Sequence, residues 1–205
     1  MRREKGRTVY ELMILSLLAR RVAHGYLIAK ILNDTIGPYT RISNGRLYPL
    51  LAKMEETGLI EIIEENDQKQ HGERILHSYQ ITERGLQRLH TLMLDTTSNQ
   101  GEYQRIFMQK VAVLNILKPQ ERLYLINHYI NYCQAHVLHL TAEIEDLETH
   151  ENEYHWDNAI RLAPTLNVMK HMAEQWRHEL AWAFCLRQQE VASQEEHQHD
   201  VESHL

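Results

Sequence analysis

Four polar side chains within one short segment are of the types that bind nucleic acid. They are Ser43, Asn44, Arg46 and Tyr48. An arginine on a helix can donate two hydrogen bonds to O6 and N7 of a guanine, while hydroxyl and amide groups reach base edges or phosphates. Simpler roles stay open: Arg46 can contact a phosphate or only water, and Tyr48 can pack inside its domain. Ser43 and Asn44 can act only as helix caps.

A helix beginning near Ser43 would position these side chains. Ser43 is a favourable N-cap residue, because its hydroxyl can accept from an amide of the first turn, and Gly58 supplies a C-terminal stop. Apolar residues recur between them at three- and four-residue spacing: Leu47, Leu50, Leu51 and Met54. One face of the helix can therefore pack on a core while another meets DNA. Pro49 predicts a late start or a local bend, because it lacks a backbone donor.

The flanking segments predict a helix-turn-helix followed by a two-stranded hairpin, or wing. The predicted elements are helices at about 8–19, 24–35 and 82–95 and strands at 61–65 and 75–81. Thr8 and Glu11 form a capping-box pattern at the start of the first helix. The cations expected near the phosphates of a bound duplex are Arg41, Lys53, Lys69 and Arg74. Acidic residues in the wing would repel the same phosphates, which favours the helix as the main contact.

Three separated motifs resemble one protein family. The pattern S-x-G-x-L-Y-P at residues 43–49 precedes E-x-x-G-L-I at 55–60, H-G-Y lies at 24–26, and Y-x-I-T-x-x-G lies at 79–85. With these motifs the chain resembles the PadR family of bacterial winged-helix transcription regulators. The wing departs from the family pattern, since it keeps Arg74 but has no proline. The resemblance implies an operator in double-stranded DNA as partner, a homodimer, and release by a small aromatic or phenolic effector.

Charge is distributed unevenly along the chain. The 205 residues are 43% hydrophobic and 24% charged with a net charge of −6, which is ordinary for a soluble globular protein. Residues 1–46 nevertheless carry 9 Lys+Arg against 3 Asp+Glu. A basic N-terminal part on an acidic body suits the binding of a polyanion, although a chance fluctuation remains the alternative. No signal peptide or long apolar segment is evident, so no membrane association is predicted and a cytoplasmic location is expected.

The C-terminal half predicts helices that pack through apolar seams. A polar stretch at 96–101 suggests a domain boundary. A helix is predicted at 102–117 with Val111 on its apolar face, and Pro119 and Pro164 suit the first turns of long helices. The predicted dimerisation residues are Leu123, Ile126, Ile130, Val137, Leu140, Ile144, Leu166, Met169, Trp176 and Leu180. Such seams indicate a coiled coil, and they can pair either between two chains or as a hairpin within one. Residues 191–205 are polar, without apolar periodicity, and are expected to be disordered.

Other chemistry finds little support in the sequence. Fourteen histidines show no ligand spacing typical of a metal site, and no nucleophile, base and orienting group stand together, so neither a metal, a cofactor nor catalysis is predicted. Cys133 and Cys185 are expected to be buried free thiols. Candidate effector-binding aromatics are Tyr129, Tyr132, Trp156 and Trp176, for which packing is the alternative role.

The sequence therefore predicts a mainly α protein with a small β wing. Residues 1–95 would form a winged helix-turn-helix, 101–190 an antiparallel helical dimerisation domain, and 191–205 a disordered tail. The expected function is a sequence-specific DNA-binding regulator, a homodimeric repressor. The alternative is a winged-helix interaction module that responds to a protein partner or a metabolite without specific DNA binding.

Overall fold

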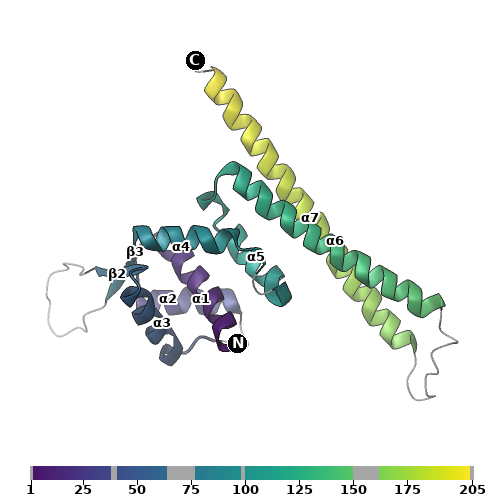
Figure 1. The fold of residues 1–205 in the computed structure, drawn as a ribbon, viewed down its shortest axis with the longest axis horizontal. Helices are drawn as coiled ribbons and strands as arrows, with labels where there is room; N and C mark the ends of the chain where they lie inside the picture. Colours follow the sequence, from purple (N-terminus) through teal and green to yellow (C-terminus); the bar gives the residue numbers. More distant parts are fainter. Residues whose placement is uncertain (1, 38–40, 64–76, 98–99, 150–161, 204–205) are drawn as a thin grey trace. The chain divides into compact units, whose positions relative to one another are not determined.

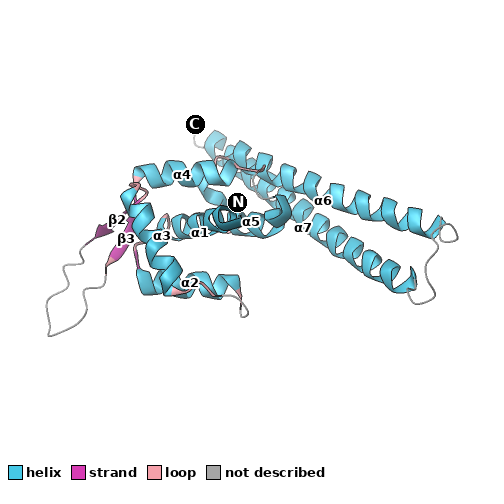
Figure 2. Cartoon of the chain, turned by 60° about the horizontal axis from the view of Figure 1, so that its bottom comes forward, coloured by secondary structure: helices cyan, strands magenta, loops and turns pink. Residues whose placement is uncertain are grey.

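The computed structural model describes residues 2–37, 41–63, 77–97, 100–149 and 162–203. The chain divides into two compact units, residues 1–117 and 118–205, and each is described by itself. Helices make up most of the fold, and a small three-stranded sheet lies in the first unit (Figure 1; Figure 2). The predicted fold class, mainly α with a small β wing, is confirmed.

The first unit contains the helices and strands predicted for a winged helix. Its elements are α1 (Arg2–Leu18), β1 (Ala23–His24), α2 (Gly25–Ile36), α3 (Asn44–Glu56), β2 (Ile60–Ile63), β3 (Ser78–Ile81), α4 (Glu83–Leu94), the 3-10 turn η1 (Gln100–Glu102), α5 (Tyr103–Val111) and the 3-10 turn η2 (Leu114–Ile116). Apolar side chains from α1, α2, α3 and α4 are fully buried together in the core. The predicted apolar face of α3 is confirmed, since Leu47, Leu50, Leu51 and Met54 are all buried.

Local capping signals explain where several helices begin and end. His24 caps α2, because its Nδ1 accepts from the amide of Leu27 at 3.1 Å. Thr82 caps α4, because its hydroxyl accepts from the amide of Gly85 at 3.0 Å. Gly58 follows α3 with a φ of 69°, a left-handed conformation that favours glycine, and its amide donates to Glu55 O at 2.8 Å. The predicted stop at Gly58 is confirmed.

The sheet has one strand more than the sequence predicted. Its order is β1-β3-β2, all antiparallel, with Tyr79 opposite both Ala23 and Ile62. β1 has only two residues and precedes α2 directly, so it fixes the start of that helix against the hairpin. The segment that joins β2 to β3, with Lys69 and Arg74, lies outside the described residues.

Four expectations are corrected by the structure. α1 begins at Arg2, so Thr8 lies inside a helix and starts none. α3 begins at Asn44 with Pro49 in its interior, so the late start predicted as one of two outcomes is wrong. The carbonyl of Gly45, which loses its donor, is on an exposed residue where water can reach it. The helix expected at 102–117 ends at Val111, and 3-10 hydrogen bonds lead on to Leu117. Cys133 is buried as expected, but Cys185 is exposed.

The second unit is an antiparallel pair of long helices, α6 (Pro119–Thr149) and α7 (Leu162–Ser203). Arg122 near the start of α6 forms an ion pair with Glu190 late in α7, at 3.0 Å, while Glu148 near the end of α6 pairs with Lys170 at 2.6 Å. The expectation of disorder is also corrected for residues 191–203, because α7 continues through Ser203.

Part of the predicted seam packs within this one chain. Leu140, Ile144 and Ala173 form a buried cluster, with Leu166, Met169 and Trp176 packed against it. The structure therefore shows the intrachain hairpin that the sequence left open as an alternative. Among the described residues, no helix combines the length and apolar character needed to cross a membrane.

Candidate nucleic-acid interface

The polar residues singled out around α3 lie on the surface of the first unit. Arg41, Ser43, Asn44, Arg46 and Lys53 are exposed, and Tyr48 is 46% exposed. All six belong to α3 or to the residues immediately before it, so the structure brings them onto one element. Lys69 and Arg74 of the wing lie outside the described part of the chain, as does Trp156.

Ser43 stands at the N-cap position of α3, but its hydroxyl forms no capping hydrogen bond. Its carbonyl oxygen instead accepts from the amides of Arg46 and Leu47, at 2.9 and 3.0 Å. The expected side-chain cap is therefore corrected. The consequence is a serine hydroxyl that is exposed at the start of the helix and not engaged as a cap.

The segment before α3 is held by a side chain that sequence analysis did not identify. Asn33 in α2 accepts from the amide of Ile42 through Oδ1 at 2.7 Å and donates from Nδ2 to Ile42 O at 3.5 Å. Ile42 is itself buried. This two-point clamp fixes the backbone between Arg41 and Ser43. The sequence marks this asparagine only weakly, because polar Asp34 and Thr35 follow it in the same turns of α2.

Arg46 extends from α3 toward α1. Its guanidinium carbon lies 5.5 Å from the ring centroid of Tyr10, a distance suited to a cation–π contact. Such a contact restricts the arginine without using its N–H donors, which stay available for a base or a phosphate. Tyr10 therefore positions Arg46. The sequence analysis did not identify it, because the two residues lie on different helices and no local pattern relates them.

Tyr48 combines the two roles left open for it. A Cβ added at Gly25 would meet Tyr48 Cε1 at 2.9 Å, so the ring packs closely over α2 where that helix has no side chain. Nearly half of the residue remains exposed. Behind it, burial raises the pKa of Tyr79, with Glu55 and Tyr48 adding to the effect. Gly25 in the H-G-Y motif is thus required for the close approach of α2 and α3.

Lys53, at the C-terminal end of α3, is already paired. Its Nζ lies 2.7 Å from Oε2 of Glu56, one turn further on. The same contact lowers the pKa of Glu56. Because both side chains are largely exposed, a phosphate can compete with this ion pair at little cost.

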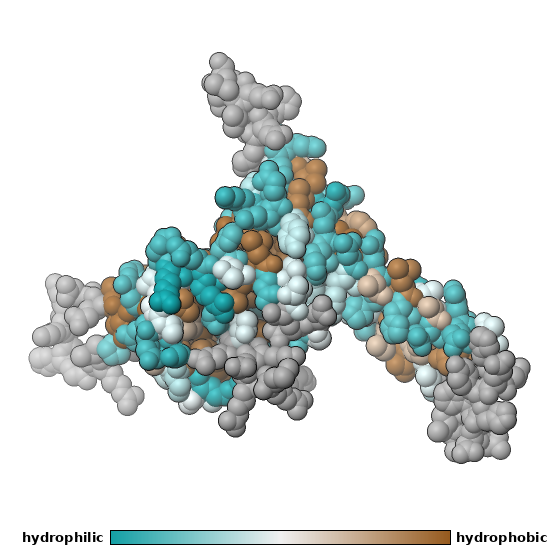
Figure 3. All heavy atoms as spheres, viewed as in Figure 1, coloured by the Kyte–Doolittle hydropathy of each residue, from teal (hydrophilic) through white to brown (hydrophobic). Residues whose placement is uncertain are grey.

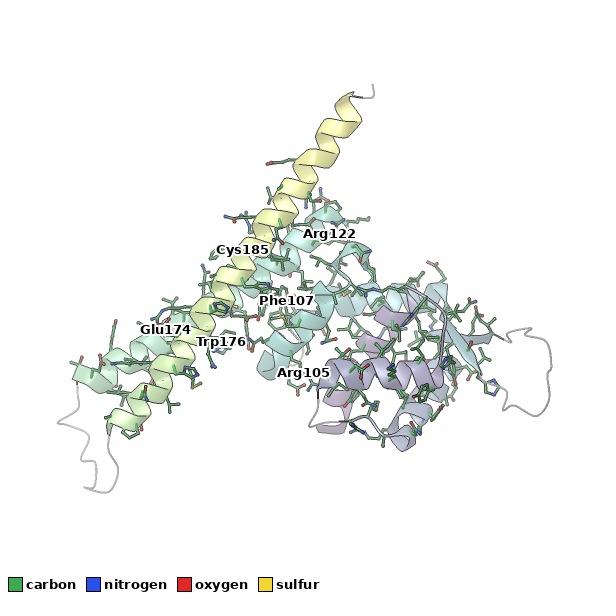
Figure 4. The ribbon with its side chains drawn as sticks, turned by 180° about the vertical axis from the view of Figure 1, so that it is seen from behind. Arg105, Phe107, Arg122, Glu174, Trp176 and Cys185 are labelled. Carbon is green, nitrogen blue, oxygen red and sulfur yellow. The ribbon has the colours of Figure 1, made fainter. Side chains whose placement is uncertain are left out.

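The aromatic residues proposed for an effector contact one another across α6 and α7. Tyr129 is buried and donates to Glu179 at 2.5 Å, and burial together with this carboxylate raises its pKa. The ring of Trp176 stacks on His136 at 4.1 Å and meets Tyr132 edge-on at 5.6 Å. Figure 4 labels Trp176 on α7. Packing accounts for these rings, and Tyr132 and Trp176 also keep partly exposed edges.

The environment of Cys133 and His136 follows from the same packing. Burial raises the pKa of the Cys133 thiol to about 12, and burial with the nearby His139 lowers the pKa of His136. Within the described ranges, no three histidine, cysteine, aspartate or glutamate residues gather in a way that could hold a metal ion.

Comparison with known proteins gives one family match. Residues 14–91, from α1 into α4, match the family described as the Transcriptional regulator PadR-like family. No curated protein matches the chain.

Three solved structures are among those to which the chain is similar. One is PadR from Bacillus subtilis in complex with operator DNA: 19% identity, 88% of this chain and 98% of that chain covered, TM-score 0.36. A second is a transcriptional regulator from Clostridium thermocellum: 26% identity, 42% and 79% covered, TM-score 0.35. A third is a transcriptional regulator from Thermoplasma acidophilum: 26% identity, 55% and 97% covered, TM-score 0.39.

These TM-scores are below 0.5, so the function is argued from the residues and from the domain match. That match contains all three motifs on which the resemblance was based, and it ends just beyond the Thr82 cap. Residues 14–91 of this chain are a PadR-like transcriptional regulator domain.

Proposed function

We propose that the chain is a sequence-specific DNA-binding regulator that acts as a homodimeric repressor. The observation that carries the proposal is the exposed polar start of α3, with Ser43, Asn44 and Arg46, in a domain of the PadR-like type. The two α3 helices of a dimer would enter successive major grooves of a pseudo-palindromic operator, with half-sites about 34 Å apart. Binding, and not catalysis, is the role proposed for these residues.

The test is binding of the full chain to DNA from directly upstream of its own gene, against random competitor, at two salt concentrations. We expect tight binding that resists competitor and falls with salt, with a log–log slope of roughly −5 or steeper. Binding that ignores sequence, or no binding, would favour the alternative, a winged-helix module that contacts a protein partner or metabolite.

Replacing Arg46 with alanine should weaken operator binding by about 1–3 kcal/mol and relax specificity at one base pair. Lys53→Ala should instead weaken operator and random DNA alike, since a lysine in that place meets phosphate. A matched variant, Glu56→Gln, releases Lys53 from its ion pair and should strengthen binding to both DNAs. Fluorescence anisotropy with the two duplexes separates these effects. Equal losses on both duplexes for Arg46→Ala would refute base reading by this arginine.

For the dimer we propose the outer face of α6, because part of the predicted seam is used within the chain. Leu138 is 71% exposed, and Tyr124 lies fourteen residues before it, almost four helical turns away and on the same side. Small exposed residues, Ala135 and Ala142, lie beside Leu138 on this stripe. Apolar residues remain visible along the helical pair (brown in Figure 3). A second copy of the chain would cover them.

Leu138→Glu should shift the protein from dimer to monomer while circular dichroism stays helical. A charged side chain at a buried interface is unpaired there, whereas it is solvated in the monomer. Gln188→Glu, at an exposed position of α7, adds the same charge and serves as the control. Sedimentation velocity measures the mass of all three proteins. If Leu138→Glu stays as dimeric as the control, α6 does not form the interface through this face.

The effector is proposed to be a small aromatic molecule that contacts the set Tyr129, Tyr132, Trp156 and Trp176. Among the described members, Tyr132 and Trp176 have the partly exposed rings that a ligand can reach. A ligand that inserts there would have to displace ring contacts already made with His136. Binding at this cluster would therefore change the packing of α6 against α7.

A further inference from the structure

A cavity of about 430 Å³ lies wholly within the first unit, whereas the aromatic cluster belongs to the second. Its walls come from α1, the C-terminal half of α3, the turn after α3, and the exposed side of α4. This volume is within the range of sites for small organic molecules. None of the DNA-contact candidates at the start of α3 lines it; Lys53 alone is shared.

One wall of the cavity is apolar. Leu50 and Met54 contribute it from α3, and Leu59 continues it from the residue before β2. Met54 is 2% exposed, so only a small part of its side chain reaches the cavity, as a hydrophobic floor. A ligand that covers this wall must carry an apolar body.

The rim is cationic. Lys53, Arg84 and Arg88 line the cavity, and Glu11 is the one acidic side chain among its described lining residues. Glu11 is engaged by Arg88 at 2.6 Å, and Lys53 pairs with Glu56 outside the cavity. Arg84 has no hydrogen bond or ion pair to any residue that the structure describes, and its guanidinium lies over the turn at Gly58.

We propose that this cavity binds a small amphipathic anion, an apolar body that carries one carboxylate or similar group. The anion would accept from Arg84, which pairs with none of the described residues, and its apolar part would cover Leu50, Met54 and Leu59. Gln87 and Thr91, on the next turns of α4, offer neutral polar contacts along the same wall. Among the described residues that line the cavity, the one carboxylate, Glu11, is already paired with Arg88.

A ligand in this cavity would contact α3 and affect its position, because Leu50, Lys53 and Met54 belong to the helix that carries Arg46. That consequence rests on the proposed DNA-binding function. Binding of the anion does not depend on that function, and the experiment below therefore uses no DNA. A negative result would count against the cavity as a binding site and would leave the proposed DNA-binding function untouched.

The probe is 1-naphthoate, titrated into the full chain labelled with ¹³C at the methionine methyl groups. We expect a saturable shift of the Met54 methyl signal, identified by its loss in Met54→Leu. The neutral analogue 1-naphthalenemethanol, with the same ring, should bind about tenfold more weakly or worse, because it cannot form a charge-assisted hydrogen bond with Arg84.

Arg84→Gln should weaken 1-naphthoate binding by a similar factor. The matched control is Arg105→Gln, an exposed arginine of α5 that does not line the cavity (labelled in Figure 4), and it should bind as wild type does. An unshifted Met54 signal, or equal binding by the two arginine variants, would overturn the proposal. Quenching of tryptophan fluorescence with no change at Met54 would overturn it too, since the tryptophans all follow residue 155 in the sequence.

Discussion

Replacing Gly85 with alanine is expected to lower the free energy of unfolding of the first unit by about 3 kcal/mol or more. An added Cβ at this position would lie 2.0 Å from the carbonyl oxygen of Leu59 and 2.7 Å from Cγ1 of Ile81. The first of these atoms belongs to the backbone, which cannot turn aside as a side chain does. The gain of up to about 1 kcal/mol that alanine brings to a helix is therefore outweighed.

The contact at Gly85 belongs to a junction that ties α3, the wing and α4 together. Thr82 donates its hydroxyl to Gly58 O at 2.6 Å, and its amide donates to Leu59 O at 3.1 Å. Alanine at 85 would push α4 away from Leu59 and strain both hydrogen bonds. We therefore expect weaker DNA binding as well, because the strands of the wing and the end of α3 share this junction.

Gly45→Ala is the matched control, since Gly45 also lies in the first turn of a helix. There an added Cβ would meet only Ser43 Oγ, at 4.0 Å, so stability should stay the same or rise slightly. Guanidinium unfolding followed by circular dichroism compares the variants. Tryptophan fluorescence should not move in either variant, because Trp176 and Trp182 report on the helical pair. A Gly85→Ala protein as stable as Gly45→Ala would contradict this account of the junction.

At the Thr82-to-Gly85 junction, some features could be predicted from the sequence and others could not. The motif was recognised by its resemblance, and the cap at Thr82 was predictable from local chemistry. The reason for the glycine was not, because the clashing atom lies 26 positions earlier in the chain, on Leu59. The same holds for Gly25 under Tyr48 and for the clamp of Asn33 on Ile42.

Helix ends were predicted well only where a local signal marks them. Gly58, Thr82, Pro119 and Pro164 gave correct boundaries, since each acts through its own backbone or cap. The start of α1 and the end of α7 were missed, because polar helix formers extend a helix without adding to an apolar stripe.

The strand β1 was missed for a different reason. It consists of Ala23 and His24 alone, and it exists only because β3 offers hydrogen-bond partners from residues 78 and 79. A run of two residues has no period to detect. For the candidate interface, α3 and its exposed residues followed from the sequence, whereas the contacts that hold them required the fold.

The burial of Lys110 was not predicted, because lysine is normally an exposed residue. The apolar pattern of α5 pointed to Val111, yet Lys110 is 1% exposed and Val111 is only half-buried. Its Nζ donates to the carbonyl oxygen of Asp95 at 2.5 Å, at the C-terminal end of α4. The lysine thus supplies a partner to a carbonyl at the helix end and joins α5 to α4 within the first unit.

The stability of the first unit is expected to rise with pH because of this lysine. Burial lowers the pKa of Lys110 from 10.5 to about 8, and Asp95 offsets only part of that effect. Between these values the unfolded chain holds the proton while the native state has released it, so the free energy of unfolding increases with pH. The penalty for the buried charge is present in full below pH 8 and is lost above pH 10.5. Its size is on the order of 3 kcal/mol.

Lys110→Met removes this titration and keeps a side chain of similar length. The variant loses the hydrogen bond to Asp95, a cost that does not depend on pH. The quantity to compare is therefore the change of the free energy of unfolding with pH, and not its absolute value. Denaturant unfolding by circular dichroism at pH 7 and at pH 10.5 should show wild type gaining about 2–3 kcal/mol relative to Lys110→Met over that range. Other groups titrate in both proteins and cancel in the difference. Parallel pH profiles for the two proteins would mean that Lys110 is not held in a native environment that disfavours its charge.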